Sequence, residues 1–407
     1  MSSHPRNTYI SFRSNRGIFP YCGTSIQADP LSALVQMCEE QISCLDGPTN
    51  DDSPMNRLTD ASATEMVHGP LCISSLMNIG TPIWHVSHLF TPAHTPTFID
   101  MTRILLTGST GGLGSEVLRY ILPLIAPSDL VIASPTPARV REAWPNLPAE
   151  VEIREGDYMR PETLPSALAG IDVFFIISYP SIAHEVRVRA HTHAIDAAKA
   201  ANVKRVIYTS IAFGEGVADV MKPHIDTEAY LRNSGVEYTI IREGLYIEAF
   251  PFYLGFFDST RDTDVYVPAD GPVSWVDRAE VGEATAHIVA KGLYVNETVL
   301  LSGSASNVLS LSQLTEHCAS VLKRPINFHV VGQDRYVEHY SGPAAQPPRD
   351  AKFVRSWGTA YIAVERGECA ILTPVLEELL GRPSREIKEY VSQLVGGTEG
   401  ALAQYAK

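Results

Sequence analysis

Short apolar runs alternate with amphipathic stretches along the chain from residue 101 to about residue 243. The apolar runs are rich in β-branched residues and have the length of buried strands, while the stretches between them have the period of helices. Strands that alternate with helices in this way form a parallel sheet that is covered on both faces. The expected strands cover residues 103–107, 129–134, 151–157, 171–178, 205–210 and 238–242, and the expected helices cover 115–122, 184–202 and a segment that Pro223 opens and Ser234 and Gly235 close.

A glycine-rich turn, TGSTGGLG at 107–114, joins the first expected strand to the first expected helix. Gly108 permits a sharp turn out of the strand, Gly111 lets the backbone approach a pyrophosphate, and Gly114 lets the helix pack close to the sheet. The helix N-terminus offers free N–H groups and a positive dipole end to phosphates. The sequence therefore predicts a doubly wound, Rossmann-type α/β fold, in which the cofactor-binding turn consists of Gly108, Ser109, Thr110, Gly111, Gly112, Leu113 and Gly114.

The pattern becomes looser after residue 243, where an aromatic cluster occupies residues 246–257. No signal there indicates an independent fold, so we expect a small α/β lobe that closes over the carboxyl edge of the sheet. Its expected elements are a helix from Asp277, helices at 312–323, 372–380 and 384–394, strands at 298–301 and 326–331, and a loop at 343–348. The expected division is a dinucleotide-binding domain at 101–245, a C-terminal substrate lobe at 246–394 and a tail at 395–407.

Residues 1–100 show no sustained period, and they contain no lysine but four of the six cysteines. We predict that they form a mostly disordered extension. Arg6, Arg13 and Arg16 precede the first acid, Asp29, which resembles a mitochondrial transit peptide. We favour a simpler interpretation, in which translation begins at Met101 and the protein is cytoplasmic.

Composition excludes several classes of function. The net charge of −14 argues against nucleic acid as a partner, and no apolar stretch approaches the length of a membrane span. The chain has neither a GxSxG elbow nor a GxxxxGK phosphate loop, so hydrolase and triphosphatase chemistry lack their motifs. His191 and His193 lie two residues apart on an expected helix and point in different directions, so we expect no metal site.

Several segments together resemble the NmrA-like family of atypical short-chain dehydrogenases/reductases, and within it the NADPH-dependent quinone oxidoreductase type two branch. They are TGSTGGLG at 107–114, EGDYMRPETL at 155–164, NVKRVIYTS at 202–210, HIDTEAYLRNSGVEYTIIREGLYIE at 224–248, WVDRAEV at 275–281 and ERGECAILTPVLEELLGRPSREIKEYV at 365–391. The resemblance runs from residue 101 to about 394.

The resemblance implies an NADPH-dependent oxidoreductase that transfers hydride to a small apolar carbonyl, enone or quinone. We expect a small-molecule substrate as its partner and a monomer or homodimer. An alternative is a non-catalytic regulator that senses the oxidised dinucleotide and binds a protein partner, as the member that gives the family its name does. A reductase or isomerase of a specialised metabolic pathway also stays open.

The end of the second expected strand decides between NADP and NAD. An acid there would bind the ribose 2′-hydroxyl of NAD, but this chain has Ser134 and, further on, Arg139. Hydroxyl and guanidinium groups without an acid favour NADP(H). Family members commonly carry an arginine where Pro135 stands, so Arg139 would have to substitute for it; alternatively, Arg139 and Arg141 are ordinary solvated helix charges.

Further cofactor-binding residues are expected at the ends of the next strands. Asp157 resembles the adenine-contacting acid of the family, and it could also cap the turn before Pro161. The carboxyl ends of parallel strands face the ligand crevice. The other candidates at these ends are Tyr158, Ser178, Tyr179 and Thr209, of which Tyr179 could equally be a packing residue.

Short-chain dehydrogenases usually use a tyrosine and a lysine four residues apart, but no lysine of this chain has a tyrosine four residues before it. His224 and Glu228 lie one helical turn apart where that pair would stand. His224 could donate a proton or hold the nicotinamide ribose while Glu228 orients it, or the two could only stabilise the helix. Tyr246 could polarise a substrate carbonyl, and Glu243 stands where relatives often carry Asn or Pro. The catalytic candidates are Ser210, His224 and Tyr246.

Overall fold

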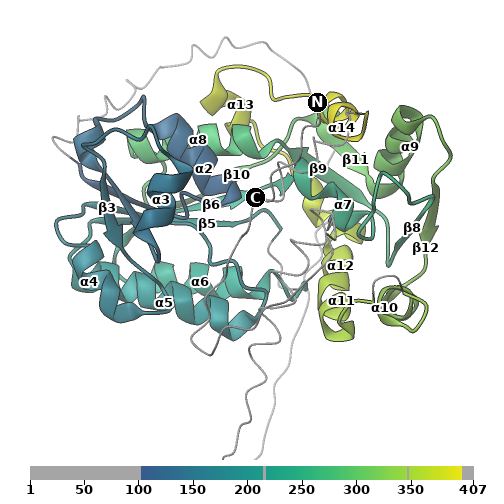
Figure 1. The fold of residues 1–407 in the computed structure, drawn as a ribbon, viewed down its shortest axis with the longest axis horizontal. Coiled ribbons are helices and arrows are strands. Elements are labelled where there is room, and N and C mark those ends of the chain that lie inside the picture. The colour runs from purple at the N-terminus through teal and green to yellow at the C-terminus, as the bar shows by residue number, and fades with distance from the viewer. Residues whose placement is uncertain (1–101, 214–216, 346–347, 397–407) are drawn as a thin grey trace, which may run out of the picture.

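A computed structural model of the chain describes residues 102–213, 217–345 and 348–396. Its centre is a parallel sheet of seven strands with β4 in the middle and the order β10-β6-β5-β4-β1-β2-β3 (Figure 1). The strands are β1 (Ile104–Thr107), β2 (Leu130–Ser134), β3 (Glu152–Glu155), β4 (Val173–Ile176), β5 (Arg205–Ile211), β6 (Glu237–Glu243) and β10 (Glu297–Leu301). This is the doubly wound α/β fold that the alternating pattern predicts.

Helices cover both faces of the sheet, as Figure 1 shows. One face carries α2 (Gly112–Ile121), α3 (Pro137–Ala143) and α8 (Arg278–Lys291), and the other carries α4 (Leu164–Ala167), α5 (His184–Ala200) and α6 (Lys222–Asn233). In α2 the buried side chains of Leu113, Val117 and Ile121 recur every four residues, so the helix presents one apolar stripe to the sheet. Each face thus has its own apolar core.

The remaining elements form a lobe beside the carboxyl ends of β5 and β6 (Figure 1). Its strands are β7 (Leu245–Tyr246), β8 (Asp264–Val267), β9 (Pro272–Val276), β11 (Val308–Ser310) and β12 (Asn327–Val330). Its helices are α7 (Phe250–Tyr253), α9 (Leu311–Leu322), α10 (Gln333–Ser341), α11 (Ala351–Gly358), α12 (Ala360–Glu365) and α14 (Ile387–Gly396), while α13 (Val375–Leu380) packs against α8. Much of the aromatic cluster at 246–257 is buried in the core of this lobe.

The six strands expected before residue 243 are confirmed, each within two residues at either end. One expectation is corrected: residues 278–301 lie inside the expected lobe, yet they return to the sheet as α8 and the edge strand β10, which pairs with β6. A short apolar run looks the same in the sequence whichever sheet receives it. Helices α10, α11 and α12 were not expected at all.

Residues 1–100 and most of the tail at 395–407 lie outside the described residues. The expected disordered extension at 1–100 therefore stays a prediction. No helix in the described part of the chain is long and apolar enough to cross a membrane.

Candidate cofactor and substrate site

The glycine turn between β1 and α2 has the geometry that its sequence predicts. Gly108 has a φ of 69°, in the left-handed region that suits glycine, and the Gly111 N–H donates to the Gly108 carbonyl oxygen at 2.9 Å. A Cβ on Gly114 would lie 2.1 Å from that same oxygen, so only glycine lets α2 pack this close to the turn. The α2 N-terminus therefore begins directly at the carboxyl edge of the sheet.

The turn borders a cavity of about 420 Å³. Thr110, Gly111 and Gly112 line it from the turn, and Arg278 lines it from α8. No side chain caps the first turn of α2, and that turn contains no acid. The Oγ of Ser109 is buried and has no hydrogen-bond partner among the described residues. Backbone donors, a helix dipole and a guanidinium group thus face one space, which suits an anion.

Arg160, which was not expected from the sequence, lies where the loops after β2 and β3 meet. The Nη1 of Arg160 lies 2.8 Å from Glu155, its Nε lies 3.0 Å from Asp157, and its Nη2 lies 3.4 Å from the Pro135 carbonyl oxygen. Arg160 therefore bridges the two loops where an adenosine ribose would lie in this fold. Its distance of 25 residues from Pro135 in the sequence gave no signal of this contact.

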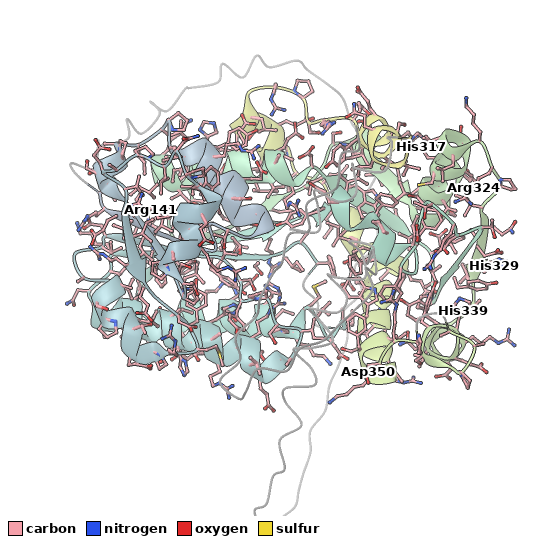
Figure 2. The ribbon with its side chains drawn as sticks, viewed as in Figure 1. Arg141, His317, Arg324, His329, His339 and Asp350 are labelled. Carbon is pink, nitrogen blue, oxygen red and sulfur yellow. The ribbon has the colours of Figure 1, made fainter. Side chains whose placement is uncertain are left out.

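Arg139 and Arg141 show no such contact. Arg139 is exposed on α3, and no side-chain hydrogen bond or ion pair is found for it within the described residues. Arg141 donates to the Val151 carbonyl oxygen at 3.4 Å and so points back along β3. Figure 2 shows Arg141 on the sheet side of the molecule, at the opposite end of the view from His329 and His339 in the lobe.

Asp157 organises its own loop. One carboxylate oxygen accepts the Met159 N–H at 2.9 Å and the other accepts the Arg160 Nε–H at 3.0 Å. This is the turn-capping role that the sequence left open beside adenine contact. The neighbouring Tyr158 is buried, with its hydroxyl 2.6 Å from the Thr107 Oγ1, so its hydroxyl ties β3 to β1.

The ends of β4 and β5 are joined by a buried polar network. The Ser178 N–H donates to the Thr209 Oγ1 at 3.0 Å, and the Tyr179 N–H donates to the His191 Nε2 at 2.8 Å. Because Nε2 accepts, the proton of His191 is on Nδ1, which lies 2.8 Å from the Thr227 Oγ1. Burial lowers the pKa of His191 to about 3, so the ring is neutral. His191 thus fixes the backbone at the site where Ser178 and Tyr179 were expected to meet a cofactor.

His224 belongs to the same network. Its Nε2 lies 3.2 Å from the Arg187 Nη1, which can only donate, so Nδ1 carries the proton and donates to the Tyr208 hydroxyl at 2.9 Å. Burial first, and then the charge of Arg187, hold the pKa of His224 well below its usual range. The neutral ring is 5% exposed and has both nitrogens occupied, which leaves it no free proton to donate.

Glu228 does not orient His224, contrary to expectation. Its carboxylate accepts hydrogen bonds from Ser210 at 2.6 Å, from Arg242 at 2.9 and 2.8 Å, and from Arg232 at 2.9 Å. Burial alone would raise the pKa of Glu228, but the hydrogen bonds from Arg242 and Ser210 bring it below its usual value. Glu228 is therefore an ionised group that links α6, β5 and β6, and the Ser210 hydroxyl donates its hydrogen to Glu228.

Tyr246 is the one catalytic candidate that is partly exposed. Its hydroxyl donates to the Oε2 of Glu243, the last residue of β6. Burial raises the pKa of Glu243 to about 8. Ser210 and Arg242 are register partners that both reach Glu228 on α6, so the side chain of the next residue, Glu243, points to the opposite face of the sheet.

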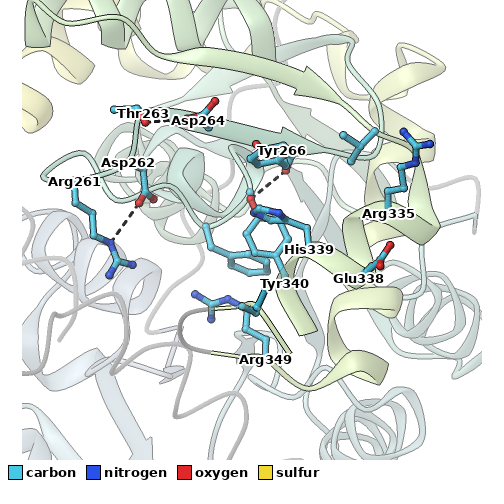
Figure 3. Close-up of a pocket in the computed structure, with 15 residues that line it drawn as sticks. Arg261, Asp262, Thr263, Asp264, Tyr266, Arg335, Glu338, His339, Tyr340 and Arg349 are labelled. Atoms are coloured by element: carbon cyan, nitrogen blue, oxygen red, sulfur yellow. Dashed lines mark hydrogen bonds and ion pairs between the residues drawn. The ribbon is translucent and has the colours of Figure 1, made fainter. Parts of the chain in front are cut away.

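A second cavity of about 750 Å³ lies wholly within the lobe and is shown in Figure 3. Its charged lining consists of three arginines and three carboxyl residues, and Arg261 is already paired with Asp262 at 3.3 Å. The Tyr340 hydroxyl donates to the Tyr266 carbonyl oxygen at 3.2 Å, and the Tyr266 ring packs against His339. No lining residue comes from the glycine turn, so we place no dinucleotide there.

The chain is similar to known proteins over most of its described length. The model of the NmrA-like family matches residues 100–343. The NmrA-like family domain-containing oxidoreductase flvB of Aspergillus flavus is 31% identical over 300 residues, which is 72% of this chain and 95% of that relative. Quinone oxidoreductase 2 of Escherichia coli is 27% identical over 298 residues, which is 72% of this chain and 98% of that relative.

Solved structures show the same fold. The NADPH-dependent quinone oxidoreductase of Escherichia coli, complexed with NADPH, has a TM-score of 0.62 at 23% identity and covers 72% of this chain and 99% of its own. The Citrobacter sp. triphenylmethane reductase, complexed with NADP(H), has a TM-score of 0.61 at 25% identity and the same coverage. The family resemblance inferred from the quoted motifs is thereby confirmed.

Proposed function

Because the chain belongs to the NmrA-like family, we propose that it is an NADPH-dependent oxidoreductase that transfers a hydride to a small apolar carbonyl, enone or quinone. The observation that carries the proposal is the glycine turn at the carboxyl edge of the sheet, where Gly114 packs against Gly108 and opens the α2 N-terminus to a ligand. The names of two relatives support the reaction class, and two solved neighbours hold NADPH or NADP(H).

The residues at this edge fit a dinucleotide. The Gly112 N–H at the start of α2 would hold the pyrophosphate, with the unpartnered Ser109 hydroxyl beside it. Arg139, expected from the sequence, and Arg160, placed by the structure, are the guanidinium groups that would meet a 2′-phosphate beside Ser134. When bound, the cofactor supplies the hydride from C4 of its nicotinamide.

Among the three catalytic candidates, the geometry favours Tyr246 as the group that touches the substrate oxygen. The Ser210 hydroxyl donates to the ionised Glu228 and both nitrogens of His224 are occupied, whereas the Tyr246 hydroxyl donates to Glu243, whose raised pKa keeps it protonated. Tyr246 is partly exposed, and it follows β6 directly at the carboxyl edge. The nicotinamide side of the site would then be lined by Thr209, Ser178 and Tyr179. His224 and Glu228 would stabilise the strands and helices that carry these residues.

The test is a titration of the full chain with NADPH and NADH, followed by absorbance-monitored oxidation of NADPH with a panel of quinones and enones. We expect NADPH to bind and at least one panel member to be reduced. Gly114→Ala forces a Cβ against the Gly108 carbonyl oxygen and should reduce NADPH affinity by about tenfold or more, since overpacking costs about 1–3 kcal/mol. Gly235→Ala, whose φ of 82° strains any Cβ but which lies at the end of α6, away from the turn, controls for a loss of stability alone and should retain binding.

Three outcomes would change the proposal. Binding without turnover on any panel member would favour the regulator that senses the dinucleotide. No binding of either nucleotide would overturn the assignment of the glycine turn. NADH binding as tight as NADPH binding would remove the preference for NADP(H). A cytoplasmic location, a monomer or homodimer and a place in specialised metabolism remain part of the proposal.

A further inference from the structure

Glu243 is a buried carboxyl group with one unused oxygen. Its side chain is 6% exposed, its Oε2 accepts the Tyr246 hydroxyl, and its Oε1 has no hydrogen-bond partner among the described residues. An ionised carboxylate with an unpartnered oxygen is costly in such surroundings, and the group avoids this cost by keeping its proton. Burial accordingly raises the pKa of Glu243 to about 8, so the carboxyl group is protonated at neutral pH.

The pair of Glu243 and Tyr246 stands next to the glycine turn. Tyr246 pairs with Val276 where β7 runs beside β9, and Arg278 follows two residues later. The Arg278 Nη1 lies 2.8 Å from the position that a Cβ on Gly112 would take. Besides Glu243, the charged groups that act on the Tyr246 phenol are those of Arg278 and Glu248, which lie 3.8 Å apart.

These neighbours do not replace Glu243 as the partner of Tyr246. Burial first, and then Glu243, which is ionised at the alkaline pH where a phenol titrates, raise the pKa of the Tyr246 phenol, whereas Arg278 lowers it. Burial also raises the pKa of Glu248 to about 7, but its nearest cation is Arg278 and no hydrogen bond joins it to the phenol. Tyr246 is thus a proton donor with one built-in proton source, the carboxyl group of Glu243.

We propose that Glu243 stores the proton that Tyr246 delivers to the substrate oxygen. This inference rests on the proposed reductase function. In the reducing step the substrate carbon gains the hydride, the electron pair of the C=O bond moves to oxygen, and the Tyr246 O–H bond breaks as its proton forms the new O–H bond. Bound substrate turns the Tyr246 O–H away from Glu243, so that the carboxyl group donates its proton to the phenol oxygen through Oε2. The phenolate takes this proton as it forms, and solvent reprotonates the carboxylate after product leaves. One hydride and one proton are consumed for each alcohol formed.

A purely structural role for Glu243 makes a different prediction, and the pH dependence of turnover separates the two. If Glu243 supplies the proton, kcat should fall as pH rises through about 8, because the carboxyl group is then ionised before the step. Glu243→Gln keeps the shape and a hydrogen bond to the Tyr246 hydroxyl but carries no transferable proton. It should lower kcat by about tenfold near pH 7, leave NADPH affinity unchanged, and lack this alkaline decrease.

Three further variants complete the experiment. Tyr246→Phe should lower kcat by about 100-fold or more, since it removes the donor itself. Glu248→Gln removes the neighbouring buried carboxyl group and should leave the alkaline decrease in place. If Glu243→Gln melts at a lower temperature than the unchanged protein, Glu243→Asn provides a second test of the alkaline decrease in kcat. Asn is a residue that the family resemblance suggests at this position.

Infrared titration gives a readout that needs no substrate. The difference spectrum between the unchanged protein and Glu243→Gln should contain a protonated carboxyl band that disappears near pH 8. An ionised Glu243 at pH 7, or turnover whose alkaline decrease persists in Glu243→Gln, would overturn the role of Glu243 while the reductase function stands. NADPH binding without turnover by the unchanged protein would overturn both, whatever the infrared spectrum shows.

Discussion

Glu228 and Glu243 are both buried, both lie near the carboxyl end of β6, and yet they face opposite sides of the sheet in opposite protonation states. Glu228 receives hydrogen bonds from two arginines and a serine, and its pKa lies below its usual value. Glu243 has one phenol for a partner and an unused oxygen, and burial raises its pKa to about 8. The difference lies in the partners, since burial is nearly the same.

The partners of these two carboxyl groups decide which of them can take part in proton transfer. A carboxylate held by cations is a fixed charge that organises the strands around it. A carboxyl group that keeps its proton near neutral pH is matched to acid–base work. Glu228 therefore positions Ser210 and Arg242, and Glu243 forms a hydrogen bond with Tyr246.

The largest expected effect is a change in the pH dependence of stability when Glu243 is replaced. The folded protein holds the Glu243 proton up to about pH 8, whereas the unfolded chain releases it near the ordinary glutamate pKa. Stability contributed by this group is thus lost as pH rises between those values. Between pH 5 and pH 8, Glu243→Gln should gain on the order of 3 kcal/mol relative to the unchanged protein, measured by urea denaturation. A constant difference between the two proteins would contradict this.

Replacing Glu228 should have the opposite dependence on pH. Its folded pKa is lowered, so its contribution is present at neutral pH and is lost as pH falls through that lowered value. Glu228→Gln should cost about 2 kcal/mol at pH 7, since it weakens several charge-assisted hydrogen bonds, and less in acid. Asp226→Asn on the same helix is the control, because its exposed pair with His184 contributes under about 1 kcal/mol. Equal losses in the two variants would refute the distinction.

The smallest expected effect concerns the adenosine end, where Arg160 is exposed and its partners Glu155 and Asp157 are exposed and half-buried, respectively. Arg160→Ala should lower the preference for NADPH over NADH by roughly fivefold, because solvent screens the contribution of an exposed guanidinium group. Arg139→Ala should lower it less, because Arg160 bridges the β2 and β3 loops and Arg139 does not. Calorimetric titration with NADPH and NADH measures the ratio of the two affinities. An unchanged ratio in Arg160→Ala would show that Arg160 does not contact the cofactor.

The sequence was sufficient for the features that depend on neighbours in the chain. The glycine turn and the strand-helix alternation are local patterns, and both are present as expected. The return of residues 297–301 to the sheet as β10 could not be predicted, since an apolar run does not specify which strand it pairs with. A helix of six residues such as α12 has too few turns to show a clear period.

The site was less predictable because its chemistry depends on partners far apart in sequence. The spacing of His224 and Glu228 placed them correctly on one helix face, but their partners are Tyr208 and Arg187 for the histidine and Arg242 for the glutamate. The protonation of Glu243 likewise depends on burial that no local pattern reveals. Residue types indicated where to look, and tertiary contacts decided what each group can do.

Hydride transfer itself is the most direct measurement. NADPH that carries deuterium on one face of C4, and then on the other, is supplied to the full chain with a carbonyl or enone that it reduces. A quinone does not serve here, because the hydrogens of its hydroquinone hydroxyl groups exchange with solvent. We predict that one of the two labelled cofactors yields product with deuterium bonded to the reduced carbon. NADPH that binds without forming product, or product that carries no label from either face, would contradict the account.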